Sequence, residues 1–275
     1  MPHTARPFIL HEATFLQVKK LAPNVAVQPW GAEEAHNYHL PHGTDSIQAE
    51  AIAEEAVAGA NAKGARCILL PCIPYGNNNM QLSQAATITM RSATQQAVLF
   101  DIADSLVRQG IDRLVIVDGH GGNDFIPMIR DIMLALPIFI VRVKPYGTAP
   151  KVKDVLENKD GDHANEMETS LMLHLKPDWV APLSTANDGA ITPSKLPLLT
   201  GNPAVWAPRH WASMSKSTGI GDPRKATAAK GKHMFDAFAA ALADILAELS
   251  AAKNGDFPFV VGELRDQVDR DFRKK

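Results

Sequence analysis

The sequence predicts a layered α/β fold, in which a mostly parallel central sheet is flanked by helices. Short runs rich in β-branched residues alternate with amphipathic helical stretches through the first half of the chain. These helical stretches are long enough to return the chain for parallel pairing of successive strands. The length of 275 residues and the 45% of hydrophobic residues suit a globular chain, which we treat as a single domain over residues 1–275.

Four strands are predicted from the β-branched runs at 25–28, 67–73, 113–117 and 138–143. In a parallel sheet, ligands bind at the loops that follow the carboxyl ends of the strands. The first and third predicted strands are each followed by an unusual group of polar residues. The edge where the strands end is therefore the expected position of a functional site.

Five helices are predicted, at 46–63, 92–109, 123–135, 164–175 and 225–251. The helix at 92–109 has the clearest boundaries, because Ser92 and Gln95 match a capping box and Gly110 is a typical stop. The stretch 182–223 is rich in Pro, Gly, Ser and Thr, which predicts long loops. We expect the charged tail after Val261 to form a solvated helix or a frayed end.

The charge balance argues against nucleic acid and membranes as partners. Lysine and arginine number 28 and aspartate and glutamate number 30, so the net charge is −2 and no basic surface is predicted. The longest apolar run, 134–141, is far too short to cross a bilayer. The N-terminus has no signal-peptide pattern, and Cys67 and Cys72 suit buried reduced thiols, so we expect a cytoplasmic protein.

The first polar group, 30–45, follows the first predicted strand and combines imidazoles with carboxylates. Its candidate metal ligands are Glu34, His36 and Asp45. Imidazole nitrogens and carboxylate oxygens together suit zinc, manganese or iron, whereas a softer site would need thiolates. The density of such side chains in one loop indicates a metal site.

Individual residues of this group also have structural explanations. Asp45 immediately precedes the predicted helix at 46–63 and has Gln48 three residues later, which suits an N-cap. His39 suits a hydrogen bond that anchors the loop, and Glu33 suits a solvated surface charge.

The second polar group, 117–123, reads VDGHGGN and follows the third predicted strand. Its glycines allow a sharp turn and a close approach of the backbone to a ligand, which leaves the His120 imidazole at the edge of the sheet. Asp118 is a candidate partner of that histidine. The alternatives are a turn that merely opens the next helix and an anion-binding turn, although the spacing matches no dinucleotide or phosphate-loop pattern.

The third polar group, 161–173, includes the start of the fourth predicted helix. Helical periodicity predicts an apolar face formed by Ala164, Met167, Leu171, Met172 and Leu175. Glu168 lies on that face and Glu166 off it. A carboxylate directed into a core is costly unless paired or metal-bound, so Glu168 is a candidate functional residue, and His163 is placed for proton transfer. The alternatives are that Glu168 caps a turn or meets an arginine, and that His163 caps the helix.

Together, the three groups resemble the motifs of the creatininase (creatinine amidohydrolase) family, in the same order. The family pattern Glu-x-His-x-x-His-Leu-Pro-x-x-Thr-Asp matches 34–45, Asp-Gly-His-Gly-Gly-Asn matches 118–123, and His-Ala-x-Glu-x-Glu-Thr-Ser matches 163–170. The likeness covers roughly 20–180. It implies a Rossmann-like α/β layer structure and a homo-oligomer, usually a hexamer.

The resemblance also implies a site with two divalent metal ions, Zn²⁺ and/or Mn²⁺, with Fe²⁺ as a further option. By analogy, Glu34, Asp45 and His120 hold one metal, and His36 and the bridging Asp45 hold the other. In creatininase, a glutamate two residues after the motif histidine completes the second site. Gly122 stands there in this chain.

We expect Glu168 to replace that missing glutamate, as a metal ligand and as a catalytic candidate. His163 matches the family's catalytic histidine. The resemblance implies that a metal-bound hydroxide attacks a small-molecule substrate, a cyclic amide or related small amide, and that His163 protonates the leaving nitrogen. The implied activity is that of a metal-dependent amidohydrolase acting on a C–N bond.

The chain departs from its relatives after the second strand, where Gln81 stands at a family histidine position. The asparagines at 77–79 offer a different recognition surface, so we expect a substrate other than creatinine. Tyr146, Trp206 and Trp211 either form an aromatic lid or pack in the ordinary way. Two further functions stay open: a metal-dependent lyase or hydrolase acting on a sugar- or polyol-derived substrate, and a non-catalytic protein that binds a small molecule.

Overall fold

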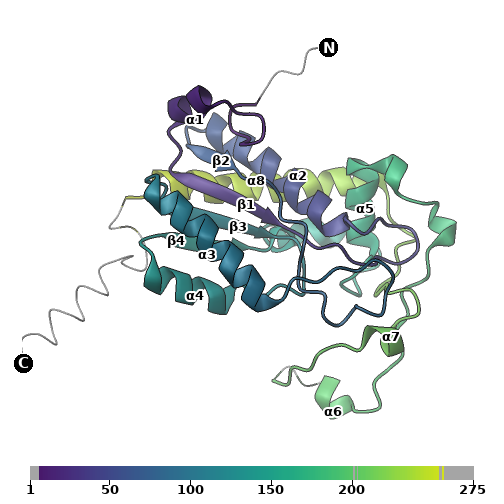
Figure 1. The fold of residues 1–275 in the computed structure, drawn as a ribbon. Helices are drawn as coiled ribbons and strands as arrows, with labels where there is room; N and C mark the ends of the chain where they lie inside the picture. Colours follow the sequence, from purple (N-terminus) through teal and green to yellow (C-terminus); the bar gives the residue numbers. More distant parts are fainter. Residues whose placement is uncertain (1–5, 201, 203, 254–255, 257–275) are drawn as a thin grey trace, which may run out of the picture.

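A four-stranded parallel sheet lies at the centre of the structure, a computed structural model that describes residues 6–200, 202, 204–253 and 256 (Figure 1). In spatial order the strands are β2 (Cys67–Leu69), β1 (Val25–Trp30), β3 (Arg113–Asp118) and β4 (Phe139–Val143). All three neighbouring pairs run parallel. The predicted parallel sheet is confirmed.

The helices of the described chain are α1 (Phe15–Leu21), α2 (Thr44–Ala62), α3 (Ser92–Arg108), α4 (Ile126–Ala135), α5 (Glu166–Leu175), α6 (Pro197–Thr200), α7 (Trp211–Met214) and α8 (Ala228–Ala251). Short 3-10 helices occur at Pro145–Gly147, Pro150–Val155, Pro177–Trp179 and Leu183–Thr185. The five predicted helices are all present, with ends shifted by a few residues. The short α1 was not predicted.

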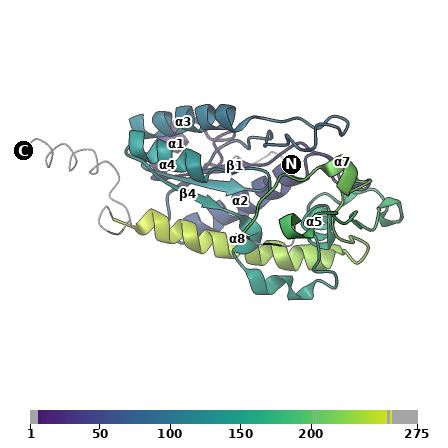
Figure 2. The same ribbon diagram turned by 90° about the horizontal axis from the view of Figure 1, so that it is seen from below.

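The sheet lies between two helical layers (Figure 2). Val25 and Val27 of β1 pack in one core with α2 and α8, whereas Ala26 packs in a second core with α3 and α4. Successive side chains of a strand point to opposite faces. Because both faces are covered, every residue of β1 and β3 is buried.

Two local predictions were wrong in detail. β2 ends at Leu69 rather than at residue 73, because Pro71 has no N–H to continue the ladder. α3 has no capping box: its N-cap is Arg91, and the Gln95 side chain instead donates to Asn123 Oδ1 at 2.8 Å. Gly110, with φ of 77°, does follow the end of α3 as predicted.

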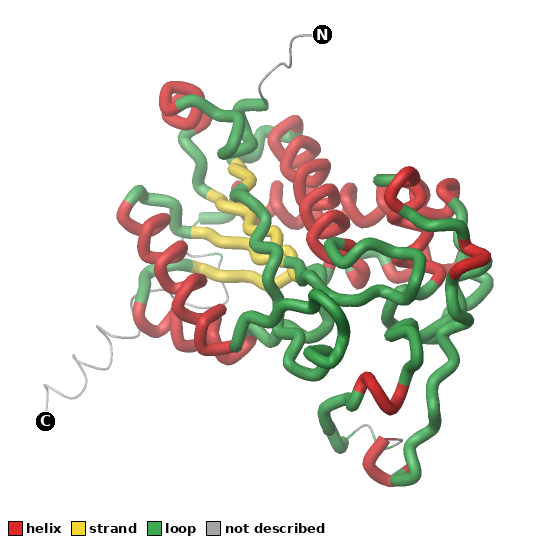
Figure 3. The backbone as a smooth tube through the Cα atoms, turned by 45° about the vertical axis from the view of Figure 1, so that its right-hand side comes forward, coloured by secondary structure: helices red, strands yellow, loops and turns green. Residues whose placement is uncertain are grey.

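Among its described residues, the stretch predicted as long loops carries only short helices, namely the 3-10 helix Leu183–Thr185, α6 and α7, and the part with α6 and α7 extends away from the sheet (Figure 3). None of the described helices has the length and apolar character needed to cross a membrane. Cys67 and Cys72 are free thiols, as expected, and burial raises the pKa of each to about 12. The charged tail after Val261 lies outside the described residues.

Candidate metal centre

The register of the sheet brings two of the polar groups together. Trp30 of β1 pairs with Asp118 of β3, so both strands end level, and Gly119 N donates to Trp30 O at 3.0 Å. A Cβ on Gly119 would lie 2.8 Å from the carbonyl oxygen of Asp45. Only glycine lets the end of β3 approach the first turn of α2 this closely.

Asp45 stands between two histidines. It is the second residue of α2, and Gly43 is the N-cap, so the interpretation of Asp45 as an N-cap was wrong. Its Oδ1 lies 3.3 Å from His36 Nε2, and its Oδ2 lies 2.9 Å from His120 Nδ1. One carboxylate oxygen faces each imidazole, which is the arrangement required of a ligand that bridges two metals.

All five predicted ligands meet in this buried cluster. Three overlapping groups have ligand atoms within 4.8 Å of one another: Glu34, Asp45 and His120; His36, Asp45 and Glu168; Glu34, His36 and His163. The first two groups contain the same residues that the family resemblance assigns to the two metals, with Glu168 in the place of the missing glutamate.

Backbone carbonyls fix the orientation of the three histidines. Each ring donates one N–H to a carbonyl oxygen: His36 Nδ1 to Glu34 at 3.0 Å, His120 Nε2 to Asn77 at 3.1 Å and His163 Nε2 to Ala35 at 2.9 Å. A carbonyl can only accept, so in each neutral ring the opposite nitrogen carries the lone pair. These lone pairs face carboxylate oxygens and repel them unless a proton or a cation lies between. The donor set therefore fits metal ions.

The electrostatics agree with this requirement for positive charge. Burial lowers the pKa of His36, but the charge and hydrogen bond of Asp45 outweigh burial and raise that pKa to about 10. Burial also lowers the pKa of His120, and Glu34 and Asp45 raise it well above the ordinary value. Burial raises the pKa of Asp45, but the two histidines drive it below its usual range. A divalent cation would take the place of these protons.

Glu168 lies in the position expected of the substitute ligand. Burial raises its pKa to about 8, against the opposing charge of His36. One oxygen, Oε2, accepts from Ala164 N at 2.5 Å, so the turn-capping alternative is also correct. No arginine pairs with Glu168 among the described residues.

Gly122 leaves no room for the glutamate that creatininase has there. A Cβ at this residue would lie 2.4 Å from Asn77 O and 2.5 Å from His120 Nε2. A side chain would therefore displace the carbonyl that orients His120. Gly122 supplies no ligand, and the second group of candidate ligands contains Glu168 of α5 instead.

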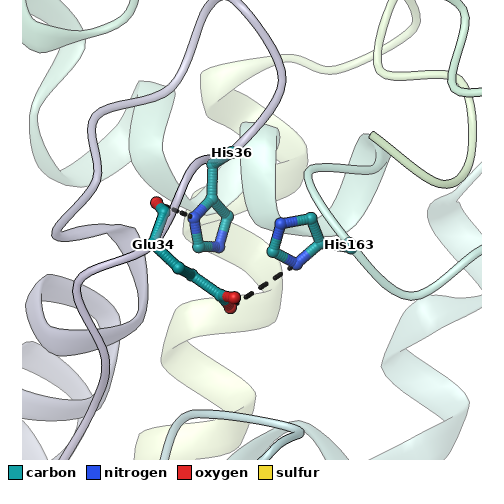
Figure 4. A group of neighbouring side chains, drawn as sticks. All are labelled: Glu34, His36 and His163. Atoms are coloured by element: carbon teal, nitrogen blue, oxygen red, sulfur yellow. Dashed lines mark hydrogen bonds and ion pairs between the residues drawn. The ribbon is translucent and has the colours of Figure 1, made fainter. Parts of the chain in front are cut away.

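His163 lies beside the cluster (Figure 4). Its Nδ1 is 3.7 Å from Glu34 Oε1, and its ring centroid is 4.2 Å from that of His36. Burial and the charge of His36 lower the pKa of His163. The cap interpretation was wrong, because Asn165 caps α5. His163 is thus a neutral base with one free nitrogen facing the site.

Of the two alternatives for the aromatic residues, a lid or ordinary packing, the structure shows packing for Trp211 and Tyr146. Trp211 is buried and its ring centroid lies 4.8 Å from that of His163. Tyr146 donates its hydroxyl to Gln48 Oε1 at 3.0 Å and packs in the core. Trp206 is 86% exposed.

Glu166 does not lie off the buried face, as helical periodicity predicted. It is completely buried and pairs with Lys230 Nζ at 2.6 Å. Its other oxygen accepts from Asn158 N at 2.6 Å. Periodicity failed because α8 and the chain before α5 cover the helix on more than one side.

Several neighbouring polar residues have structural roles. Asp118 accepts from the backbone N–H of His120 at 3.3 Å rather than from its ring. His39 anchors its loop through Thr169 Oγ1 at 2.8 Å, as predicted. The Asn78 side chain donates to the backbone carbonyls of Glu33 and Ile88, so its amide nitrogen is not free to bind a substrate. Glu33 is half-buried rather than fully solvated.

The sequence profile described as creatinine amidohydrolase matches residues 11–246, most of the chain. The chain belongs to the creatininase family. Among solved structures, a candidate creatinine amidohydrolase from Bacteroides fragilis NCTC 9343 is 36% identical, with a TM-score of 0.83 over 91% of this chain and 99% of that one. The creatininase fold, inferred above from the motifs, is confirmed.

Curated creatininase-family relatives act on different kinds of substrate, to judge by their names. The mycofactocin precursor peptide peptidase of Mycolicibacterium smegmatis is 29% identical over 92% of this chain and 96% of its own length. The creatinine amidohydrolase of Pseudomonas putida is 29% identical over 57% of this chain and 66% of its own length.

Creatininase itself has been solved in different metal forms. A mutant creatininase of Zn-Zn type and a manganese form of creatininase align over 90% of this chain and all of theirs, with TM-scores of 0.73 and 0.72. Their identities of 21% and 22% establish a shared fold.

Proposed function

We propose that this chain is a metal-dependent amidohydrolase that hydrolyses the C–N bond of a small cyclic amide or of a short peptide. The observation that carries the proposal is the meeting of five buried nitrogen and oxygen ligands beside a neutral histidine. Relatives named as a peptide peptidase and as a creatinine amidohydrolase both cleave amide-type bonds by name, which supports the reaction class.

Glu34, Asp45 and His120 would hold one ion, and His36, Asp45 and Glu168 the other. Zinc or manganese suits these donors. Bound there, two divalent ions would polarise the substrate carbonyl and make a water molecule acidic. The cluster is buried, so the carboxylates and imidazoles are held in place before the substrate arrives.

His163 moves the proton in this proposal. Its Nε2 is committed to the Ala35 carbonyl, so Nδ1, which faces Glu34, is the atom that exchanges protons. Because its pKa is lowered, the ring is neutral at pH 7 and accepts a proton at Nδ1. It then delivers that proton to the nitrogen that leaves. Trp211 packs against the ring and holds it in position.

The same geometry allows His163 to be a metal ligand, since it forms a group with Glu34 and His36. The two roles differ in a measurable way. We predict that His163→Asn keeps about two metal ions per chain and loses activity by at least about 10²-fold. Asp45→Asn should lose metal as well as activity. Metal loss in His163→Asn equal to that in Asp45→Asn would make His163 a ligand.

A substrate screen with added manganese and zinc tests the reaction class. Cyclic amides, formamides, short peptides and keto-sugars should be compared, with metal content measured by mass spectrometry. We expect turnover of an amide or a peptide. Turnover of keto-sugars alone would favour the sugar-directed enzyme, and less than one metal per chain after supplementation would favour a non-catalytic binding protein.

A further inference from the structure

A cavity of about 430 Å³ opens beside the candidate metal centre. His120 and Glu168 line one part of it, and Lys144, Lys153 and Lys159 line another. The volume is in the range of pockets that hold small organic ligands. A substrate that reaches the metal ligands through this cavity therefore passes beside the lysines.

Among the described residues, the ammonium groups of two of these lysines are not held in an ion pair. Lys159 is paired with Asp154 at 2.8 Å, so its charge is neutralised within the wall. The side-chain ammonium groups of Lys144 and Lys153 form no hydrogen bond or ion pair within the part of the chain that the structure describes, although the charge of Asp118 acts on Lys144 and that of Glu168 on Lys153. Lys144 is exposed to solvent, whereas Lys153 is half-buried. Of the three lysines that line the cavity, Lys153 is therefore the one whose positive charge is only partly solvated.

The acidic residues that line the cavity do not neutralise Lys153. Asp162 pairs with Arg209 at 2.6 Å, and Asp118 lies 3.7 Å from Arg142 Nε. Glu168 is close enough for its charge to raise the pKa of Lys153 against the lowering effect of burial. When Glu168 binds a metal ion, however, its charge is shared with the metal. Lys153 is then left without a counter-charge.

We propose that Lys153 is a specificity-determining residue that binds a free carboxylate of the substrate. The substrate class is an amide that also carries a carboxylate, such as an N-acyl amino acid or the C-terminal end of a peptide. A lysine ammonium forms short, charge-assisted hydrogen bonds with a carboxylate, and these are strong where the ammonium is partly desolvated. This inference rests on the proposed amidohydrolase function and adds the substrate class.

The test uses binding, so that it does not depend on turnover. The probes are N-benzoylglycine, which has an amide and a free carboxylate, and N-benzoylglycinamide, which lacks the carboxylate. Calorimetry on the metal-loaded protein should show that the carboxylate probe binds about 10- to 100-fold more tightly. That preference should weaken as sodium chloride is added.

Lys153→Gln should abolish this preference, and Lys153→Arg should retain most of it. Lys151→Gln is the matched control, because Lys151 is exposed on the same 3-10 helix and does not line the cavity. An unchanged preference in Lys153→Gln, or no preference in the unmodified protein, overturns the proposal.

Metal content separates the proposal from a purely local role. If Lys153 only balances Glu168, Lys153→Gln should change metal content and leave the carboxylate preference as it was, which also overturns the proposal. Lys153→Arg shows whether the position tolerates substitution. A chain that prefers the carboxylate probe but hydrolyses no amide contradicts the proposed function alone, and amide hydrolysis without carboxylate preference contradicts the role of Lys153 alone.

Discussion

Because Gly122 has no side chain, the Asn77 carbonyl and the His120 ring can lie close to it. A Cβ there would overlap Asn77 O and His120 Nε2, the two atoms whose hydrogen bond orients a candidate ligand. We predict that Gly122→Ala weakens metal binding by about 10- to 100-fold, because partners that orient ligands have effects of this size. Competition with a chromophoric chelator measures it. Gly121→Ala is the control, since a Cβ there meets nothing within 4 Å. Equal affinities in both variants would contradict the prediction.

The raised pKa of His36 predicts that protons are released when metal binds. Its pKa of about 10 in the metal-free protein means that Nε2 carries a proton at pH 8, and a metal must displace it. Metal affinity should therefore rise with pH up to about 10. Calorimetry in buffers with different ionisation enthalpies measures the released protons, and His36→Asn should release fewer. A heat of binding that is independent of buffer would rule the mechanism out.

The same raised pKa affects stability in the metal-free protein. The folded pKa of about 10 exceeds the unfolded value of about 6.5. The pairing of His36 with Asp45 therefore stabilises the metal-free fold fully below about pH 6.5, and this contribution is lost as the pH rises through about 10.

Which side chains meet in the centre was predictable from residue types and from the family resemblance. The backbone contacts that orient these side chains were not predictable. The carbonyls of Asn77 and Ala35 orient two of the histidines, and every residue has a carbonyl, so no residue type marks them. Lys153 was also missed, because one lysine in a stretch of several charged residues carries no local signal. The role proposed for Lys153 follows from its position in the cavity wall and from the lack of an ion pair there among the described residues.

At the scale of elements, an ion pair between a buried carboxylate and a partly buried lysine fixes α5 against α8. Glu166 is completely buried, and Lys230 is its cationic partner. We predict that Lys230→Met lowers the free energy of unfolding by about 2 kcal/mol, because it leaves a buried carboxylate with only backbone partners. Lys232→Met should change it by less than about 0.5 kcal/mol, since the pair with Asp236 is exposed. Urea denaturation measures both. Similar effects of the two substitutions would contradict the prediction.

The elements themselves were largely predictable, and their exceptions have physical causes. β-branched runs covered on both faces identify the strands, since neither face needs polar residues. The helical periodicity of α5 misplaced Glu166, because periodicity assumes one buried side and α5 has more. Asp45 matched an N-cap by position, but its side chain had a stronger partner in two histidines.

At the scale of the whole molecule, the segment with α6 and α7 exposes apolar side chains. Leu198 is 83% exposed and Trp206 is 86% exposed. Clustered exposed apolar residues are typical of protein contacts. We predict that the chain forms a homo-oligomer, a hexamer by family resemblance, and that Leu198→Glu with Trp206→Glu dissociates it. Light scattering after gel filtration measures the mass, with the exposed Lys195→Glu as control. A monomeric unmodified chain would contradict the prediction.

The loop that carries His36 is closed by residues from far along the chain. Thr218 Oγ1 donates to Ala35 O at 2.7 Å and accepts from Asn37 N at 3.0 Å. Asn37 also donates to the carbonyl of Asn187 at 2.9 Å. During synthesis the ribosome delivers Thr218 long after Glu34 and His36 have emerged. The candidate ligand set is therefore complete in sequence well before these contacts hold it in place, and the centre takes the shape described here only after Thr218 has been synthesised.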